Sequence, residues 1–518
     1  MDDDRLPSHS RKMWLRFAVA ALLIAGLSGG ATATIALNEV ENLGGKFFNK
    51  NNTVPVKPGL IKEYTGGPQT YLVLGTDRRP KSKDALDRTD PPHSDTILLV
   101  RFDPGQGQTS VLSIPRDLLV NIKSSKGEYY PQEKINAAYT YGAKLGGVKG
   151  SMELAAETIE KEVFPGLEIN GIVDVNFASF IKIVDTLGCV YVNVDHRYLH
   201  VNGEGGELYS EINLQPGYQK LCYNNALSYV RYRHGDSDFV RVARQQDFLR
   251  ALREQVSASD LLGQVEHVAT VVGKAIVTAG FSRSADRVIE LAKLIAFSQG
   301  KPLRQVKFRA ASTNFALKGG SYVTTTEAMK RATLDDFLNG DEKVAKPKPA
   351  PKPKPNAKGH HHSRAHGSSA PTAASLGLSS SGSAGEAEIA KGTINMPLKV
   401  LYPSLQTASS VEQPARAYDL RDQGQRLRHA YVAVWRANAL GGYYDFEGTD
   451  WQKPPLIAHP NEQRKIKGVT YMIFTDGSHI HVVAWRQGHM VYWLTNTLLE
   501  DLSNEQMLAI ARSAKPLH

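Results

Sequence analysis

Thr70-Tyr-Leu-Val-Leu-Gly-Thr-Asp-Arg-Arg79 is a short apolar run that ends in a glycine and a carboxylate, with two arginines directly after it. An apolar run of this length that is closed by a turn residue predicts a buried β-strand. Two further runs of the same kind follow, at His93–Phe102 and Gln108–Ile114. Their spacing predicts a meander of three strands, and the polar residues at the strand ends are Asp77, Asp95 and Arg116.

Helical and strand patterns alternate after this meander, up to about residue 337. Helices are expected at Gly150–Val163, Phe180–Leu187, Gln264–Ala279 and Ala285–Ser298, and a further helix that Asn224 caps leads to Arg231. Strands are expected at Ile169–Phe177, Gly188–Val194 and Val306–Ala311. Because the alternation follows no strict βαβ repeat, the sequence predicts a layered α/β/α domain over residues 68–338.

The stretch Arg231–Gln246 holds four arginines, at positions 231, 233, 241 and 244. From Phe239 onward apolar residues recur at helical spacing, so a helix is expected there, capped by Ser237 or Asp238. A turn at Gly235 can fold Arg231 and Arg233 back towards Arg241. Guanidinium groups suit phosphate oxygens, so converging arginines predict a diphosphate site. The alternative is a solvated basic face with Asp236 and Asp238 as ion-pair partners.

Asp77 and Asp95 form the second candidate site. Carboxylates at strand ends often hold a hard divalent cation, which prefers oxygen ligands and keeps several waters. Two aspartates without a histidine or cysteine partner favour Mg²⁺ or Mn²⁺ over zinc. The alternative is that both residues cap turns or pair with neighbouring arginines.

The chain of 518 residues has room for two or three domains, and its formal net charge is +10. Seven lysines and arginines without an acid lie between Lys343 and Arg364, so most of the excess charge belongs to one low-complexity segment. The rest of the chain is nearly balanced and has no zinc-finger or RNA-binding pattern. A nucleic-acid partner is therefore not expected.

The N-terminal region reads as a membrane anchor. Residues 1–12 are polar and basic, and Phe17–Leu37 carries no charge over a length that spans a bilayer as a helix. We therefore expect a cytoplasmic tail at 1–12, a transmembrane helix at 13–37 and an extracytoplasmic chain after it. A cleaved signal peptide ending near Ala31-Thr-Ala33 is the alternative. Residues 38–67 are expected to form a polar stalk.

The C-terminal part divides into a linker and a small domain. Residues 339–392 contain Lys-Pro repeats, three adjacent histidines and a Ser/Ala/Gly stretch, which predict a mobile tether. Residues 393–518 are expected to form an α+β domain, with a hairpin through Thr475–Ser478 and a capping box at Ser503–Gln506. Four tryptophans lie in this domain, and they either form its core or bind sugars.

Cys189 and Cys222 are the two cysteines of the chain. Outside the cytoplasm, a disulfide between them is the natural interpretation. Two buried thiols are the alternative.

Eight short motifs occur in one order over residues 68–258. Together they resemble the LytR–CpsA–Psr (LCP) family of bacterial cell-wall transferases. The matching residues are Gly75–Arg79, Ser94–Thr96, Ser113–Asp117, Lys134–Tyr139, Ile169–Ile172, Val175–Phe177, Ala226–His234 and Arg241 with Arg244-Gln245. The residues after 258 match this family more loosely, up to about residue 337.

The resemblance implies a phosphotransferase that acts outside the membrane. It would move a glycopolymer from a polyprenyl-diphosphate carrier to peptidoglycan as a phosphodiester, with Mg²⁺ (or Mn²⁺) as the cofactor. Carried over by position, Asp77 and Asp95 would hold the metal, and Asp95, Arg116, Arg231 and Arg233 would be catalytic. The diphosphate contacts would be Arg79, Arg88, Lys134, Asp238, Arg241, Arg244 and Gln245. The lipid is expected to lie near Ile169–Phe180 and the helices after Gln264.

This chain departs from the family pattern where an arginine often precedes Asp95 by two residues, because His93 stands there. Arg88, from an enlarged loop, is the candidate for replacing that charge. Residues 393–518 resemble domains appended to some actinobacterial-type members. Two other functions stay open: a hydrolase that uses water as the acceptor of the same diphosphate, and an anchored polymer-binding regulator without catalysis.

Overall fold

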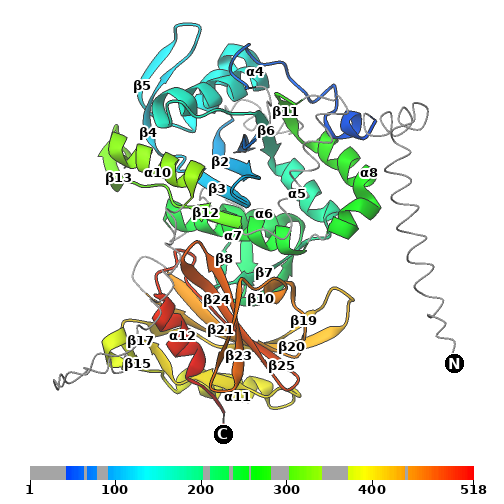
Figure 1. Cartoon of the computed structure of the whole chain (residues 1–518), viewed down its shortest axis with the longest axis vertical. Helices are drawn as coiled ribbons and strands as arrows, with labels where there is room; N and C mark the ends of the chain where they lie inside the picture. Colours follow the sequence, from blue (N-terminus) through cyan, green and yellow to red (C-terminus); the bar gives the residue numbers. More distant parts are fainter. Residues whose placement is uncertain are drawn as a thin grey trace, which may run out of the picture.

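Three consecutive strands form the antiparallel meander expected from the sequence. They are β1 (Gln69–Thr76), β2 (Ser94–Asp103) and β3 (Gln108–Ile114). In this computed structural model, β6 (Gly171–Asn176) pairs parallel with β1, and β12 (Leu303–Val306) pairs parallel with β3. With β11 (Val277–Ala279) at the edge, the sheet has the order β11-β6-β1-β2-β3-β12 (Figure 1).

The structure describes residues 42–62, 67–78, 92–201, 211–232, 237–255, 258–281, 303–340, 372–437 and 442–517. Within the first domain, four two-stranded ladders accompany the main sheet. They are β4 (Leu119–Lys123) with β5 (Tyr129–Lys134), β7 (Val190–Val194) with β10 (Gly217–Leu221), β8 (Tyr198–His200) with β9 (Ile212–Leu214), and β13 (Ser312–Leu317) with β14 (Gly320–Thr324).

Helices cover both faces of the six-stranded sheet. One face buries alternate residues such as Leu72, Leu99 and Leu112 against α4 (Ala137–Thr158) and α10 (Glu327–Asn339). The opposite face carries α5 (Phe177–Thr186), α6 (Tyr223–Arg231) and α7 (Asp238–Gln255), with α8 (Ala258–Ala275) packed on α5. Because strand side chains alternate between the two faces, each helical layer has its own apolar contact surface. The expected layered α/β fold is confirmed.

Several helix boundaries follow from local sequence. Helix α4 begins before the helix expected at Gly150–Val163 and has a break at Gly146 and Gly147, where Gly147 adopts a φ of 60°. Helix α7 begins after Ser237, whose Oγ accepts a hydrogen bond from the backbone N–H of Val240. Helix α6 has Cys222 as its N-cap, so the expected cap at Asn224 is wrong by two residues. A π-helical turn, Ile159–Val163, extends α4.

The strand expected at Val306–Ala311 is also wrong. Strand β12 ends at Val306, where that strand was expected to begin. From there the chain leaves the sheet, and Lys307 Nζ donates to the carbonyl of Leu499, 2.8 Å away in the second domain. A tertiary contact therefore replaces the ladder that the local pattern favours. The helix expected at Ala285–Ser298 lies outside the described residues.

The polar stalk expected at 38–67 is corrected for residues 42–62, which pack on the first domain. Phe48 is 2% exposed, and its ring stacks on Phe281 with centroids 4.8 Å apart. Val54 N–H donates to the carbonyl of Thr278, and Leu60 joins the core of the domain. Few apolar residues in a polar segment suffice here, because each inserts into an existing surface. The globular part of the chain thus begins before residue 68.

Among the described residues, no helix combines the length and the apolar character that crossing a bilayer requires. The anchor expected at 13–37 lies outside those residues.

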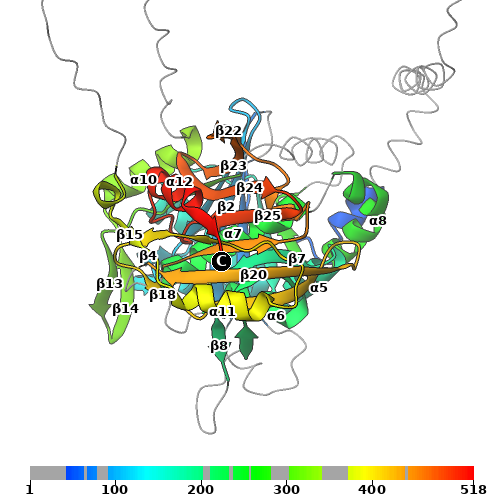
Figure 2. The same cartoon turned by 90° about the horizontal axis from the view of Figure 1, so that it is seen from below.

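The second domain is built on one large antiparallel sheet, of order β18-β20-β21-β25-β24-β23-β22, with β19 also paired to β20. Its face away from the first domain is covered by α11 (Ala384–Thr393) and α12 (Asn504–Arg512) (Figure 2). The strands are β18 (Val411–Glu412), β19 (Arg416–Arg421), β20 (Leu427–Arg436), β21 (Tyr443–Thr449), β22 (Glu462–Ile466), β23 (Val469–Asp476), β24 (His479–Gln487) and β25 (Met490–Thr495). Short pairs flank the sheet, β15 (Leu378–Ser380) with β17 (Leu405–Thr407), and β16 (Leu401–Pro403) with β26 (Ala514–Pro516); two 3-10 turns lie at Ala374–Leu376 and Pro455–Ile457.

The hairpin predicted in this domain is confirmed, since β23 and β24 pair around the turn at 477–478. The capping box is also confirmed: Ser503 accepts from the N–H of Gln506, and the Gln506 side chain accepts from the N–H of Ser503. All four tryptophans are buried. Their side chains form the core and are Trp435, Trp451, Trp485 and Trp493.

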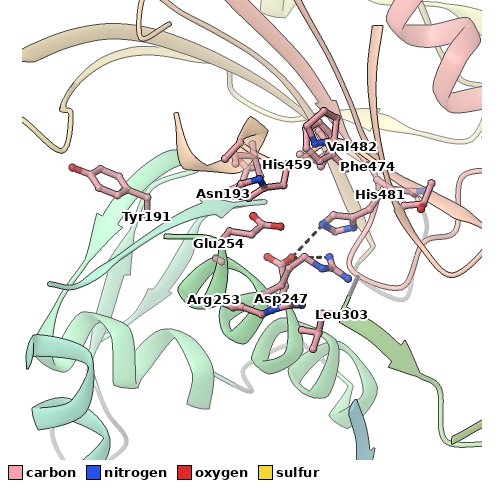
Figure 3. Close-up of a pocket in the computed structure, with 18 of the residues that line it drawn as sticks. Tyr191, Asn193, Asp247, Arg253, Glu254, Leu303, His459, Phe474, His481 and Val482 are labelled. Atoms are coloured by element: carbon pink, nitrogen blue, oxygen red, sulfur yellow. Dashed lines mark hydrogen bonds and ion pairs between the residues drawn. The ribbon is translucent and has the colours of Figure 1, made fainter. Parts of the chain in front are cut away.

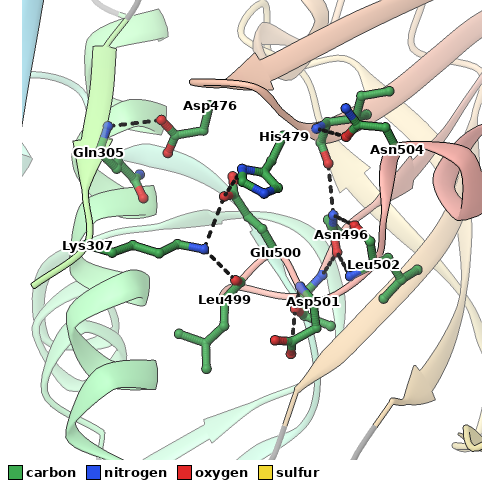
Figure 4. Close-up of polar contacts among 12 residues, drawn as sticks. Gln305, Lys307, Asp476, His479, Asn496, Leu499, Glu500, Asp501, Leu502 and Asn504 are labelled. Carbon is green, nitrogen blue, oxygen red and sulfur yellow. Dashed lines mark hydrogen bonds and ion pairs between the residues drawn. The ribbon is translucent and has the colours of Figure 1, made fainter. Parts of the chain in front are cut away.

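The two domains share a hydrophobic core. Tyr191 of β7 and Tyr218 of β10 pack among residues of the second sheet, including Trp451 and Trp493. Polar contacts border this core: Tyr218 N–H donates to Tyr418 Oη at 2.7 Å. A second set joins β12 to the far domain, where Gln305 N–H donates to Asp476 Oδ1 at 2.9 Å and Lys307 pairs with Glu500 at 3.4 Å (Figure 4).

The linker expected at 339–392 is corrected at its C-terminal end. Strand β15 pairs with β17, and α11 packs on β19 and β20. Ile389, which α11 contributes to the core of the second domain, is completely buried. Residues 372–392 therefore belong to the folded domain, because Leu378 and Ile389 give this Ser/Ala/Gly segment enough apolar surface to pack. The Lys-Pro and His tracts, residues 341–371, lie outside the described residues.

Candidate active site

An apolar slot lies between the sheet and helices α5, α6 and α7. Its volume is ≈ 580 Å³. The sheet contributes Val73, Thr96 and Leu98 to the lining. The helices contribute mainly apolar side chains, which are Phe177, Phe180, Ile183, Val184, Leu227, Val230, Phe248, Leu249 and Leu252.

A polar cleft of ≈ 490 Å³ lies at one end of this slot. Charged and polar side chains line it, namely Asp77, His93, Asp95, Arg116, Asp117, Glu133, Lys134, Asn136 and Thr140, together with Tyr141 and Tyr322. Asp95 and Arg116 line both the slot and the cleft. The apolar and the polar space therefore meet at this pair.

Arg116 is the centre of the charged cluster at this junction. Its Nη1 atom lies 2.6 Å from Asp95 Oδ1, and its Nε atom lies 3.6 Å from Asp117 and 3.8 Å from Asp238. Burial would raise the pKa of Asp95, but the positive charges of Arg116, Arg241 and Arg231 outweigh burial and lower this pKa. Asp95 is thus an ionised carboxylate at neutral pH.

Arg241 and Arg231 approach the same junction from α7 and α6. Arg241 is 3% exposed and pairs with Asp238 one turn earlier on its helix. The Arg231 guanidinium lies over the ring of Phe177, 4.0 Å from its centroid, and lines the slot. Burial raises the pKa of Asp238, although Arg241 and Arg116 act against this shift.

Two buried N–H groups at the junction lack an acceptor. Among the described residues, neither Nε of Arg116 nor Nε of Arg241 has a hydrogen-bond partner. Leaving a buried donor unpaired costs roughly 1–3 kcal/mol, more for a charged group. An anionic ligand at this place would satisfy both donors, so the arrangement fits phosphate oxygens.

Asp77 and Asp95, the two carboxylates predicted at strand ends, both line the cleft. Asp77 Oδ1 accepts from the N–H of His93 at 2.7 Å. Burial raises the pKa of Asp77, and the negative charge of Asp95 adds to this shift. Within the described residues, no group of three or more His, Cys, Asp or Glu side chains gathers as a metal site. Two carboxylates fit Mg²⁺, because that ion takes its other ligands from water and substrate oxygens.

Lys134 and Gln245 also lie at the site. Lys134 Nζ is 2.8 Å from Asp117 Oδ1 and lines the cleft. Gln245 lines the slot and donates from Nε2 to the carbonyl of Val230 at 3.0 Å, which joins α7 to α6.

Arg244 is not brought to this place. Its side chain is completely buried, Nε donates to Tyr198 Oη at 3.0 Å, and Nη1 donates to the carbonyl of Tyr232 at 2.9 Å. It also lies over the ring of Tyr198, 4.7 Å from the centroid, and lines neither the slot nor the cleft. The structure therefore does not bring Arg244 to the slot or the cleft, because tyrosines enclose its guanidinium.

Three predicted site residues, Arg79, Arg88 and Arg233, lie outside the described residues. The disulfide between Cys189 and Cys222 is present, with Cα atoms 4.8 Å apart. It joins the residue before β7 to the N-cap of α6, the helix that ends in Arg231. The disulfide interpretation is thus confirmed, and it fixes the start of an arginine-bearing helix.

Sequence reasoning missed part of the site. The lipid-sized slot was expected near Ile169–Phe180 and the helices after Gln264, and α5 does contribute Phe177 and Phe180. The remaining helical wall comes from α6 and α7 rather than from α8, as far as the described residues show. The sequence shows the apolar stripe of α7 through Leu249 and Leu252. The spacing of these residues does not indicate which surface of the domain the stripe contacts.

Buried Asp174 beside the site was missed as well. It accepts hydrogen bonds from Tyr139 Oη and from Arg78 Nη2, the latter at 3.4 Å. Burial raises the pKa of Asp174 against the effect of Arg78. A single aspartate in the strand Gly171–Asn176 was the signal that could have found this contact.

Comparisons with known proteins agree with the motifs. The model of the LytR_cpsA_psr family matches residues 40–333. An uncharacterized Staphylococcus aureus protein is 31% identical over 211 residues, 40% of this chain, and the match spans about half (47%) of that protein. The polyisoprenyl-teichoic acid–peptidoglycan teichoic acid transferase TagT of Bacillus subtilis is 28% identical over 280 residues, 52% of this chain and 79% of that protein.

Among solved structures, B. subtilis TagV is 22% identical, with a TM-score of 0.41, over 52% of this chain and 97% of that chain. A LytR-Csp2A-Psr enzyme from Actinomyces oris is 18% identical, with a TM-score of 0.39, over 55% of this chain and 96% of that chain.

Proposed function

Because the chain belongs to the LytR–CpsA–Psr family, we propose that it is a glycopolymer–peptidoglycan phosphotransferase. The donor would be a glycopolymer on a polyprenyl-diphosphate carrier, and the product a phosphodiester between that polymer and peptidoglycan. TagT, a relative named for transfer of teichoic acid to peptidoglycan, supports this reaction class.

One observation carries the proposal: the apolar slot and the polar cleft meet at Asp95 and Arg116. A polyprenyl diphosphate has the same division, with a long apolar chain attached to a charged head. In this arrangement the polyprenyl chain of the lipid occupies the slot between the sheet and α5–α7. The diphosphate then lies against Arg116, Arg231 and Arg241, and the sugar extends into the cleft.

The reaction exchanges one P–O bond for another. The acceptor hydroxyl oxygen bonds to the phosphorus that carries the glycopolymer, and the bond from this phosphorus to the bridging oxygen breaks. The bridging oxygen leaves with the electron pair as part of polyprenyl phosphate, and the hydroxyl proton passes to a base. Such reactions depend mainly on positioning and on positive charge at the phosphoryl oxygens.

The arginines of the junction supply that charge. The acceptor-free Nε atoms of Arg116 and Arg241 can donate to phosphate oxygens without breaking a hydrogen bond. Both guanidinium groups are held in place beforehand, by Asp95 for Arg116 and by Asp238 for Arg241. Preorganised donors of this kind stabilise the transition state, because they do not have to reorient during the reaction.

Mg²⁺ is part of the proposal, with Asp77 and Asp95 as its protein ligands. When bound, it would neutralise charge on the diphosphate and polarise the phosphoryl group. Asp95 already accepts from Arg116, and the positive charges of Arg116, Arg241 and Arg231 lower the pKa of this carboxylate.

Asp117 is the proposed base that takes the proton of the acceptor hydroxyl. Asp117 lines the cleft, carries no role as a metal ligand and lies 2.8 Å from Lys134. A base has to lie within hydrogen-bond reach of the hydroxyl whose proton it takes. Asp77 and Asp95, at the strand ends, also line the cleft, but a carboxylate bound to a metal is a weak base.

The proposal places the enzyme at the outer face of the cell membrane. Residues 13–37 would span the bilayer, with residues 1–12 in the cytoplasm, since basic residues precede the apolar run. The disulfide supports an oxidising compartment outside the cytoplasm for the folded domains.

The test uses the full chain in detergent with Mg²⁺, a polyprenyl-diphosphate-linked oligosaccharide and peptidoglycan fragments. Both polyprenyl phosphate and the glycan–phosphate–glycan product are measured. We expect product that requires the acceptor and that Arg231→Ala abolishes, whereas Arg309→Ala, an exposed arginine paired with Asp336, leaves it unchanged.

Lipid phosphate released without acceptor product would overturn the transfer reaction in favour of hydrolysis. Tight binding of the lipid diphosphate by a folded protein, with neither product, would favour a binding or regulatory protein.

A further inference from the structure

A second cavity, of ≈ 760 Å³, lies between the two domains. Helix α7 and strand β7 form its wall in the first domain, and strands β23 and β24 with the segment 456–461 form the wall in the second. Figure 3 shows Glu254 of α7 facing His459 across this space, and Asp247 of the same helix in contact with His481. Its volume is within the range of roughly 300–1,000 Å³ that small-molecule sites have.

The lining combines aromatic rings with many hydrogen-bonding groups. Tyr191, Tyr218 and Phe474 supply the rings. The polar groups are carboxylates, amides, imidazoles and guanidiniums, contributed by Asn193, Asp195, Asp247, Arg250, Arg253, Glu254, His459, Asn461, His481 and Asn496. The lining therefore offers both donors and acceptors, and this suits a ligand that carries many hydroxyl groups.

Charges in the cavity are balanced. Arg250 lies 3.3 Å from Asp247 and 2.7 Å from Asp476, so two carboxylates neutralise it. Arg253 neighbours Glu254 on the same helix. Because no positive charge is left over among these described residues, the cavity offers little to a polyanion. In this it differs from the junction at Arg116.

Two buried polar atoms of the lining lack partners. Asn193 Oδ1 and His481 Nδ1 have no hydrogen-bond partner among the described residues. The other atoms of both side chains are engaged: Asn193 Nδ2 donates to Asp445 Oδ2 at 2.9 Å, and His481 Nε2 lies 3.1 Å from Asp247 Oδ1. Each side chain is therefore held in place, with one polar atom left for a ligand.

The cavity also has an accessible side. Ala458, His459 and Asn461 are exposed, whereas Asp195 and Asn496 are buried. The polar contacts between β12 and the second domain fix the spacing of the two walls. A ligand can thus enter at 458–461 and reach groups that are already positioned.

We propose that this interdomain cavity binds a neutral oligosaccharide segment. The aromatic rings pack on sugar faces, and the carboxylates, amides and imidazoles bond to hydroxyl groups. The inference goes beyond the proposed transfer reaction, since it assigns a second glycan site to a different part of the molecule. The two sites share α7 as a wall: Gln245, Phe248 and Leu252 line the slot, and Asp247, Arg250 and Glu254 line the cavity.

The test measures binding of two neutral probes to the full chain in detergent by calorimetry. The probes are the β-1,4-linked tetramers of N-acetylglucosamine and of glucose, and polyphosphate is the anionic comparison. Ala458→Trp places a large ring at the entrance of the cavity without filling a core. We expect at least tenfold weaker binding of the neutral probe in this variant. Ala387→Trp, at an exposed position of α11, is the matched control and should leave binding unchanged.

Glu254→Gln keeps the shape of the side chain and removes its charge, and we expect binding to weaken about threefold. The inference is overturned if neither tetramer binds, if Ala458→Trp binds as well as the wild type, or if polyphosphate binds better than both sugars.

Arg116→Gln separates this inference from the proposed function. If the neutral tetramer binds in the interdomain cavity, Arg116→Gln binds it as tightly as the wild type does. If Arg116→Gln abolishes binding and Ala458→Trp does not, the sugar occupies the transfer site, and only the further inference fails.

Discussion

The slot and the interdomain cavity lie on opposite faces of α7, and they differ in how charge is arranged. At the slot, the arginines lie among the carboxylates of Asp95, Asp117 and Asp238, yet the Nε–H groups of Arg116 and Arg241 have no acceptor among the described residues. In the cavity, Arg250 is matched by Asp247 and Asp476. The comparison teaches that the number of arginines says little about the ligand. What matters is whether their N–H groups already have acceptors within the protein.

The largest expected effect concerns the face of α7 that lines the slot, where Arg116 lies at the junction with the cleft. Arg116→Gln keeps a hydrogen-bonding side chain but removes the charge that lies 2.6 Å from Asp95. We expect transfer to fall about 10²–10³-fold, as when an oxyanion donor is lost. Rates of product formation at saturating lipid, with the melting temperature as a folding control, check this. An activity within threefold of the wild type would contradict the role of the junction.

The second prediction separates two arginines that are three residues apart. Arg244→Met removes hydrogen bonds to Tyr198 and to the carbonyl of Tyr232, and we expect the free energy of unfolding to fall by about 2–3 kcal/mol. Arg241→Met should instead lower the transfer rate with a smaller loss of stability. Denaturant unfolding and the rate per folded molecule check both. Equal losses of transfer rate in the two variants would show that Arg244 contributes to the active site as Arg241 does.

The third prediction narrows the slot from the α7 side. Leu249→Trp adds a ring to its apolar wall, and we expect KM to rise about tenfold for a donor with a long polyprenyl chain, equal to about 1.4 kcal/mol. A donor with a short isoprenoid chain should be affected little. A rise of the same size for both donors would show that the chain does not occupy the slot.

The smallest expected effect concerns the face of α7 that lines the interdomain cavity, and it is a change in the pH dependence of stability. Burial raises the pKa of Glu254 to about 7, from an ordinary value of 4.5. Between these values the folded protein keeps a proton that the unfolded chain releases, so the free energy of unfolding falls as pH rises. Glu254→Gln has no ionisable group at this position, so its free energy of unfolding does not fall with pH for this reason. We expect the variant to match the wild type near pH 5 and to be more stable by roughly 1 kcal/mol at pH 8, as measured by thermal unfolding at both pH values.

Much of the first domain could be predicted from the sequence, because its signals are local. The meander of β1–β3 follows from apolar runs with polar ends, and the cap at Ser237 from its position before an apolar helix. The positions of Asp77, Asp95 and Arg116 followed from the same pattern, since strand ends that share one edge bring their side chains together.

Features that depend on distant contacts could not be predicted. The burial of Arg244 depends on Tyr198, 46 residues away along the chain. The packing of residues 42–62 depends on Phe281 and Thr278. The docking of the second domain depends on Tyr191 and Tyr218, which as isolated tyrosines in strand patterns gave no sign of a partner.

The core shared by the two domains has a consequence for shortened forms of the chain. Tyr191 and Tyr218 are 3% and 2% exposed, and both pack in the core to which the second sheet contributes. A chain cut off before the second domain would present these rings as part of an apolar patch, and such patches favour association between chains.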